Sequence, residues 1–247
     1  MATQRLAGAV TALLLLSTGA CHSPEAPSPP LPHEDKLQYT FRWIANPSLD
    51  LMSPEGTFVR AISESYDNAN YADGRGRVAL AEKGYPGFEH AENNVWDSAD
   101  IGGATNPQVG TDYREVVDFR RDGARYTAIV CSYWGGTASK QSDGTYIGRG
   151  FAPVGSAYAY TFGPDTSLAP DQQHLPPAQQ RGPARRPSDN VFGTWLLFDQ
   201  PHVSNDQESA CHRVAPGTSE GMPDPYKRSD PPPTLSPDPG WPEGSSA

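Results

Sequence analysis

Proline is distributed unevenly along this chain of 247 residues, and its distribution limits where regular structure can form. Proline fixes φ and has no amide N–H to donate, so helix interiors and central strands exclude it. The 26 prolines and 24 glycines make up about a fifth of the chain, well above the average of ~12%. Prolines are dense in residues 22–32, 164–188 and 216–247. We therefore expect one folded domain over residues 37–215, with a Pro/Gln-rich surface loop at residues 164–188.

The C-terminal residues 216–247 have the composition of a disordered tail. They include nine prolines, and their sizeable apolar side chains are only Met222, Tyr226, Leu235 and Trp241. Such a segment buries too little apolar surface to offset the entropy lost on ordering. The sequence predicts that residues 216–247 are disordered.

Residues 1–20 have the order of a secretory signal peptide. Arg5 precedes an apolar run at residues 7–16, and the small residues Ser17, Thr18, Gly19 and Ala20 follow. The apolar run is shorter than the ~20 residues that span a bilayer as a helix. This segment is therefore an export signal and not a membrane anchor.

The residue after this signal is Cys21. The stretch Ser17-Thr18-Gly19-Ala20-Cys21 resembles the lipobox of bacterial lipoproteins, except that Thr18 stands where an aliphatic residue is usual. The resemblance implies a diacylglycerol thioether on Cys21, attachment to the extracytoplasmic face of the cell membrane, and a Pro-rich tether over residues 21–36. The alternative is an ordinary secreted protein in which this cysteine lies near the cleavage site by chance.

The cysteine count agrees with lipidation. An exported protein with three cysteines has one that cannot pair within the chain. If Cys21 carries lipid, Cys131 and Cys211 are left to form a disulfide in an oxidising compartment. The alternative for this pair is two buried free thiols.

The charge of the chain excludes some partners. The net charge is −10, and loss of Arg5 with the signal peptide makes it −11. So acidic a protein repels phosphate backbones and anionic headgroups. We expect no nucleic-acid partner, and membrane attachment through lipid alone.

The clearest helix signal begins at Ser53. Ser53 is an N-cap, Pro54 occupies the first helical position, and Glu55 lies at the positive end of the helix dipole. Apolar residues then recur at helical spacing as far as residue 69. A second, weaker helix is predicted at residues 77–81, with residues 84–87 as a stop and turn, or extending to residues 88–93.

Four strands are predicted after these helices. Residues 113–119 and 125–134 flank the turn-forming pair Asp122-Gly123 and form a hairpin, with Tyr113, Glu115, Val117 and Phe119 on one face. Residues 158–162 and 192–198 are the other two strands. This order predicts an α+β fold, in which an amphipathic helix packs on a curved antiparallel sheet of about four strands flanked by disordered Pro-rich segments.

Two family resemblances follow from these features. The order of elements over residues 51–198 is similar to the nuclear-transport-factor-like and cystatin-like superfamily. The lipobox and the proline content resemble the secreted, mycobacterial-type lipoproteins of actinobacteria whose function is undefined. Neither resemblance carries a catalytic residue over to this chain.

No recognisable catalytic, cofactor or metal motif occurs in the sequence. The six histidines form no HxH or HExxH pair, and CxxC, GxSxG and phosphate-loop patterns are absent. Ser132 lies in a predicted strand, where a hydroxyl is usually structural. We therefore expect no metal, no cofactor and no catalytic residue that could be named.

Aromatic residues on the strands are the candidates for a binding pocket. They are Tyr133, Trp134, Tyr158, Tyr160 and Trp195. Such side chains can line a concave pocket, although they are also common in the core and in cross-strand pairs. The sequence therefore favours a binding module for a small apolar or sugar-like ligand or for another envelope protein. The alternatives are a cell-envelope hydrolase and a lipoprotein that blocks a surface receptor.

Overall fold

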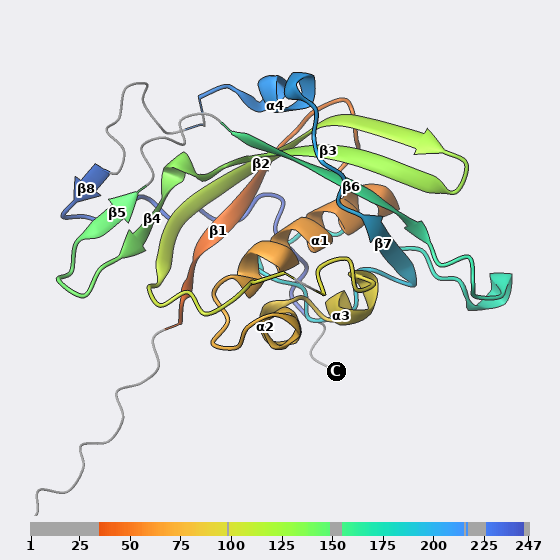
Figure 1. Ribbon diagram of the computed structural model, residues 1–247, viewed down its shortest axis with the longest axis horizontal. Helices are drawn as coiled ribbons and strands as arrows, with labels where there is room; N and C mark the ends of the chain where they lie inside the picture. Colours follow the sequence, from red (N-terminus) through yellow and green to blue (C-terminus); the bar gives the residue numbers. More distant parts are fainter. Residues whose placement is uncertain (1–34, 98, 149–154, 215, 217–225, 245–247) are drawn as a thin grey trace, which may run out of the picture. The chain divides into compact units, whose positions relative to one another are not determined.

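The computed structural model describes residues 35–97, 99–148, 155–214, 216 and 226–244 (Figure 1). The helices are α1 (Pro54–Ala69), α2 (Arg77–Lys83), α3 (Phe88–Ala91) and α4 (Asn205–Cys211), with the short 3-10 turns η1 (Trp134–Gly136) and η2 (Pro170–Gln172). The strands are β1 (Leu37–Ile44), β2 (Gln108–Asp122), β3 (Arg125–Tyr133), β4 (Thr137–Lys140), β5 (Tyr146–Gly148), β6 (Ser156–Pro164), β7 (Trp195–Asp199) and β8 (Tyr226–Arg228).

The fold is α+β, and its sheet is larger than predicted. Within the described residues the strands form one sheet of eight in the order β7-β6-β3-β2-β4-β5-β8, with β1 paired to β2. All pairs are antiparallel except β1 and β2, which are parallel. The prediction of about four strands was wrong because β1, β4, β5 and β8 were not foreseen. β4, β5 and β8 have at most four residues each, too few for a period-two pattern.

Helix α1 lies under the curved sheet and fills its inner face (Figure 1). Its start is the predicted one: the Oγ of Ser53 accepts a hydrogen bond from the amide of Gly56 at 3.1 Å, and Pro54 follows. Phe58 and Ile62 of α1 are fully buried in the main hydrophobic core. The ring of Phe58 stacks on Phe162 of β6 at 4.8 Å, so the apolar stripe of the helix contacts the sheet directly.

Strand β2 changes course in two places. Near its start, β4 pairs with residues 108–110, and β3 pairs with residues 113–122 along the same edge. The turn η1 separates β3 from β4, and Gly110 accommodates it with a φ of +106°. The register also shifts between Val116 and Asp118, which indicates a β-bulge.

Because of this bulge, the prediction that Tyr113, Val117 and Phe119 share one face of the hairpin was wrong. Tyr113 and Val117 pack with the smaller hydrophobic cluster, but Phe119 belongs to the main core with Val116. One inserted residue moves the following side chains to the opposite face. Phe119 therefore does not share a face with Tyr113 and Val117.

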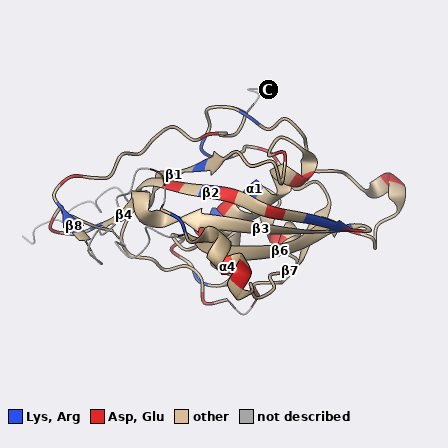
Figure 2. Cartoon of the chain, turned by 90° about the horizontal axis from the view of Figure 1, so that it is seen from above, with Lys and Arg blue, Asp and Glu red and all other residues tan. Residues whose placement is uncertain are grey.

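Helix α4 covers the opposite face of the sheet from α1 (Figures 1 and 2). It packs over β3 and β6, and a disulfide joins its last residue, Cys211, to Cys131 of β3. The predicted pairing of these two cysteines is confirmed. Both cysteines are fully buried in the smaller hydrophobic cluster, beside Ile129 and Tyr133.

The C-terminal segment contradicts the prediction of a disordered tail, since residues 226–244 are folded onto the domain. β8 pairs with β5, and Asp238 hydrogen bonds with β1 through the Trp43 amide at 2.7 Å. Trp241 is only 1% exposed and packs in the main core. The prediction was wrong because it counted only the apolar residues of the C-terminal segment itself. The indole of Trp241 packs against residues that lie far away in the sequence.

Several other predicted elements are confirmed. The second helix is α2 and ends two residues later than predicted, while residues 88–93 contain the separate short helix α3. Residues 158–162 and 192–198 correspond to β6 and β7. The loop at residues 164–188 contains only the turn η2, but Pro176 and Pro187 within it are buried.

The signal peptide, Cys21 and the predicted tether as far as residue 34 lie outside the described residues. Among the residues that are described, none of the helices is both long enough and apolar enough to cross a membrane.

Candidate functional site

A cavity of about 670 Å³ opens between the C-terminal end of α1 and the inner face of the sheet, where β3 gives way to β4. Its walls come from β1, α1, the loop at residues 102–106, and strands β2, β4, β5 and β6, with η1 at the bend. Residues that lie more than a hundred positions apart therefore meet around one space. A cavity of this size is typical of small-molecule sites.

Aromatic rings form much of the cavity wall. They are Tyr39, Tyr66, Tyr71, Trp134 and Tyr158. The phenol of Tyr39 donates to Oδ1 of Asn68 at 3.2 Å, which orients its ring. Burial raises the pKa of Tyr39, Tyr66 and Tyr158, so these phenols stay neutral at physiological pH. They can then both donate and accept hydrogen bonds.

Polar side chains complete the wall on the side of β2 and β4. The amide of Gln108 donates to the Thr137 hydroxyl at 2.7 Å, and its carbonyl accepts from the Ser139 hydroxyl at 2.9 Å. Asn70 and Asn106 also line the cavity. The ligand space is therefore bounded by π-faces and by neutral hydrogen-bonding groups together.

Of the five aromatic residues chosen from the sequence, the structure places Trp134 and Tyr158 in the cavity lining. Tyr160 and Trp195 belong instead to the main core, and Tyr133 packs beside the disulfide. Tyr158 and Tyr160 show the reason for the difference. They are two residues apart on β6 and share a face, but one meets the cavity and the other meets α1 through Ser63.

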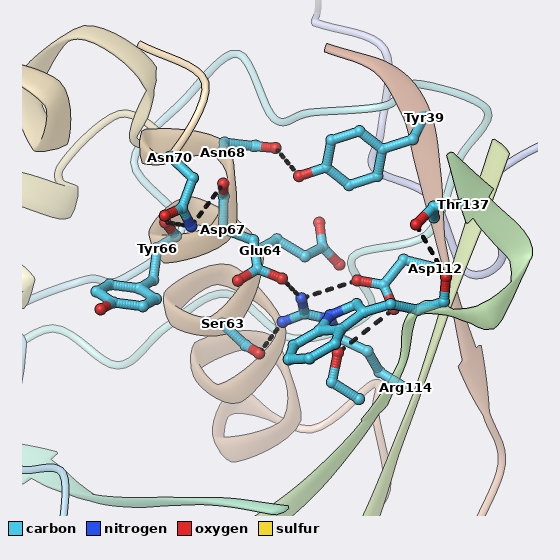
Figure 3. A network of polar contacts seen from close by, with 12 residues as sticks. Tyr39, Ser63, Glu64, Tyr66, Asp67, Asn68, Asn70, Asp112, Arg114 and Thr137 are labelled. Atoms are coloured by element: carbon cyan, nitrogen blue, oxygen red, sulfur yellow. Dashed lines mark hydrogen bonds and ion pairs between the residues drawn. The ribbon is translucent and has the colours of Figure 1, made fainter. Parts of the chain in front are cut away.

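Two aspartates line the cavity, and one arginine behind them connects both (Figure 3). Nη2 of Arg114 lies 3.0 Å from Oδ2 of Asp112 and also contacts Oδ2 of Asp67. Nη1 of Arg114 contacts the Ser63 hydroxyl. The side chains of Arg114 and Asp112 are each 2% exposed, whereas that of Asp67 is 23% exposed. Asp67 is thus the member of this group that faces open space.

Glu64 lies one turn before Asp67 on α1, and its carboxylate is buried like that of Asp112. It accepts hydrogen bonds from the indoles of Trp43 at 2.6 Å and Trp241 at 2.8 Å, and from the phenol of Tyr85 at 2.6 Å. Three donors satisfy a buried carboxylate that would otherwise be costly. Glu64 therefore ties α1 to β1 and to the C-terminal segment.

Burial shifts the ionisation of the inner pair. Desolvation raises the pKa of Asp112 well above its usual 3.8, while a hydrogen bond from Ser132 opposes the shift. Desolvation also lowers the pKa of Arg114. Both shifts favour the neutral forms, because burial removes the water that stabilises each charged group.

Asp67, Asp112 and Arg114 were not predicted from the sequence. Asp112 and Arg114 alternate with Val116 on β2, so two charged residues occupy the inner face of a strand. The alternation of these two residues with Val116 could have pointed to the site from the sequence, since a charged residue on a buried face is uncommon unless it is paired. No comparable signal marks Asp67, which looks like the polar side of a helix.

No group of three or more His, Cys, Asp or Glu side chains suited to a metal ion occurs in the part of the chain that the structure describes. The serine considered earlier, Ser132, is buried and hydrogen bonds to Asp112 at 3.4 Å. Its hydroxyl belongs to the buried polar network behind the cavity.

No protein-family model, no curated protein and no solved structure matches this chain.

Proposed function

We propose that this chain is a binding module, anchored to the extracytoplasmic face of the cell membrane by lipid on Cys21, whose cavity receives a small sugar-like molecule. The observation that carries the proposal is the composition of the cavity wall. Aromatic rings offer surfaces for the C–H faces of a sugar ring, and Gln108, Asn70 and Asn106 offer partners for its hydroxyls.

The wall favours this ligand over the two others considered. A purely apolar ligand would displace water from the amides and carboxylates of the lining and offer them no hydrogen bond in return, which is costly in a desolvated site. A protein partner would need a broad exposed apolar patch. The exposed large hydrophobic side chains among the described residues are Val78, Leu175 and Leu235, which lie on three different segments.

Calorimetry with the neutral disaccharide cellobiose tests the ligand class. We expect measurable binding that falls at least tenfold in Trp134→Ala, because this ring forms part of the cavity wall. Phe119→Ala is the matched control, since Phe119 is a half-buried aromatic residue outside the lining, and its affinity should stay within twofold. Equal affinities in the two variants, or no binding to the native protein, would overturn the sugar-like assignment.

The anchor is tested independently of the ligand. Cys21→Ala removes the only atom to which the lipobox could attach lipid, so the protein should move from the membrane fraction to the soluble extracytoplasmic fraction. A conservative Thr18→Leu variant, closer to the usual lipobox, should stay with the membrane. Undiminished membrane retention of Cys21→Ala would overturn the lipoprotein assignment.

A hydrolase acting on the cell envelope is the second candidate, because two carboxylates line one cavity. Glycoside hydrolysis needs two carboxyl groups about 5–10 Å apart on either side of a bond. Asp67 and Asp112 contact the same guanidinium, so they lie side by side instead of flanking a space for that bond. Mass analysis of a bound disaccharide after prolonged incubation separates the two functions, since a binding module returns it intact.

A further inference from the structure

The charged groups that line the cavity are all acidic. Asp67 and Asp112 belong to the wall, and no lysine, arginine or histidine does so within the described residues. Arg114 lies behind the two aspartates, almost fully buried. A ligand that enters the cavity therefore meets carboxylates and not the guanidinium.

Two arginines, Arg60 and Arg114, are buried behind this wall. Arg114 contacts Asp67 and Asp112. Arg60 does not pair with a carboxylate: it donates to the carbonyls of Gln180 at 2.7 Å and of Pro239 and Gly240 at 3.0 Å. Within the described residues, Arg114 is therefore the cation that contacts Asp67.

Asp67 is placed to present its carboxylate to a ligand in the cavity. Its Oδ2 contacts Arg114, while the side chain keeps 23% of its surface open. The rings of Tyr66, Tyr71 and Tyr39 line the same cavity. The faces of aromatic rings attract cations within about 6 Å, and the attraction grows when water is excluded. A carboxylate in a cavity lined by phenol rings offers an ammonium group both an opposite charge and π-faces.

We propose that the sugar-like ligand carries a protonated amino group, and that this group binds at the carboxylate of Asp67 among the tyrosine rings. The inference rests on the proposed function, because it assigns a charge to the ligand of the same cavity. The acidic wall thus acts as a selectivity filter that admits amino sugars, tolerates neutral sugars and rejects uronic acids.

Three disaccharides of one shape test this proposal. They are the β-1,4-linked dimer of glucosamine, cellobiose, and cellobiuronic acid, titrated at pH 6, where the amines are protonated. We expect the glucosamine dimer to bind at least tenfold more tightly than cellobiose, and the uronic acid to bind more weakly than either. Benzylammonium and benzyl alcohol form a second pair that tests charge preference without a sugar.

The variant Asp67→Asn keeps the shape of the side chain and should bring the affinity for the glucosamine dimer to within about twofold of that for cellobiose. Asp67→Glu restores the charge and should restore part of the preference. Asp171→Asn removes the same charge from an exposed position outside the cavity and should leave the preference intact. A circular dichroism melt confirms that each variant is folded.

The outcomes are distinguishable. Binding of cellobiose with no preference for the glucosamine dimer, or a preference that survives in Asp67→Asn, overturns the charge assignment and leaves the proposed function standing. Binding of benzylammonium over benzyl alcohol without any disaccharide binding overturns the sugar-like assignment and keeps the cationic one. If none of these probes binds, both proposals fall.

Discussion

Asp112 and Arg114 show how much a pair of residues depends on what surrounds it. They are neighbours on one face of β2, and each side chain is only 2% exposed. Asp67 and Asp112 share the single guanidinium of Arg114, so one positive charge cannot offset both carboxylates when they are ionised. The stability of the folded protein should therefore depend on the ionisation of Asp112.

The variant Asp112→Asn should become more stable relative to the native protein as pH rises. In the unfolded chain this carboxyl ionises near 3.8, whereas burial raises its pKa in the folded protein. Between these two pKa values the folded state holds a proton that the unfolded state has lost, so native stability falls with rising pH. The difference in unfolding free energy should grow by about 1.4 kcal/mol per pH unit in that window and then level off.

Urea denaturation of both proteins from pH 4 to pH 8 measures this difference. A difference that declines with pH would mean that Arg114 holds Asp112 ionised and that its pKa is lowered in the folded state. Asp171→Asn, at an exposed position, provides the baseline for a charge removed from the surface.

At the scale of elements, the C-terminal segment makes long-range contacts that hold α1 in place. Trp241 donates to Glu64 at 2.8 Å, and the guanidinium of Arg60 lies 4.2 Å from the centre of its ring. Arg60 also donates to the carbonyls of Pro239 and Gly240. This segment closes the core around the helix that forms one side of the cavity.

Trp241→Ala should lower the free energy of unfolding by about 3–5 kcal/mol, because it empties a buried site and removes a hydrogen bond from a buried carboxylate. Leu235→Ala in the same segment is the control, since Leu235 is 43% exposed and its truncation should change stability by less than about 1 kcal/mol. Equilibrium urea denaturation compares the two. Equal effects would contradict the docking of Trp241 into the core.

At the scale of the whole molecule, the disulfide joins the sheet to helix α4, which covers the face opposite α1. Cys131 lies in β3 and Cys211 ends α4, and the two are 80 positions apart in the sequence. Closing a loop of that length restricts the unfolded chain, and the chain-entropy model gives a stabilisation of about 4 kcal/mol. The bridge holds α4 against the face opposite the cavity.

Replacing both Cys131 and Cys211 with alanine should lower the denaturation midpoint in urea by the equivalent of about 2–5 kcal/mol, with ligand affinity at the cavity unchanged, since neither cysteine belongs to its lining. In the native protein, a thiol assay under denaturing conditions should find two thiols after reduction that are absent before it. Free thiols at these two positions before reduction would contradict the bridge.

Local patterns predicted the parts of the fold that depend on neighbours in the sequence. Ser53 and Pro54 mark the start of α1 because a cap needs only the amides of the first turn. Asp122 and Gly123 mark the hairpin because the turn needs only a residue with positive φ, which Gly123 supplies at +61°. The pairing of Cys131 with Cys211 followed from the cysteine count and from the expectation that Cys21 carries lipid.

β1 could have been predicted by the same means, since Tyr39, Phe41 and Trp43 alternate and are buried. Its parallel pairing with β2 could not, because parallel strands are joined by a long connection whose length carries no register information. Trp241 is a similar case. Its partner Arg60 is 181 positions away, and no local sequence pattern around either residue predicts the contact.

The sequence by itself therefore determined the main helix, the central hairpin, the disulfide pair and the α+β class, because each depends on local spacing or on composition. The size of the sheet, the docking of the C-terminal segment and the cavity were decided only by the tertiary structure. Trp134 and Trp195 show the physical reason: both are aromatic residues of the strand region, yet one lines the cavity and the other packs in the core. A side chain becomes part of a site through what packs opposite it, and that depends on how α1 and five strands come together.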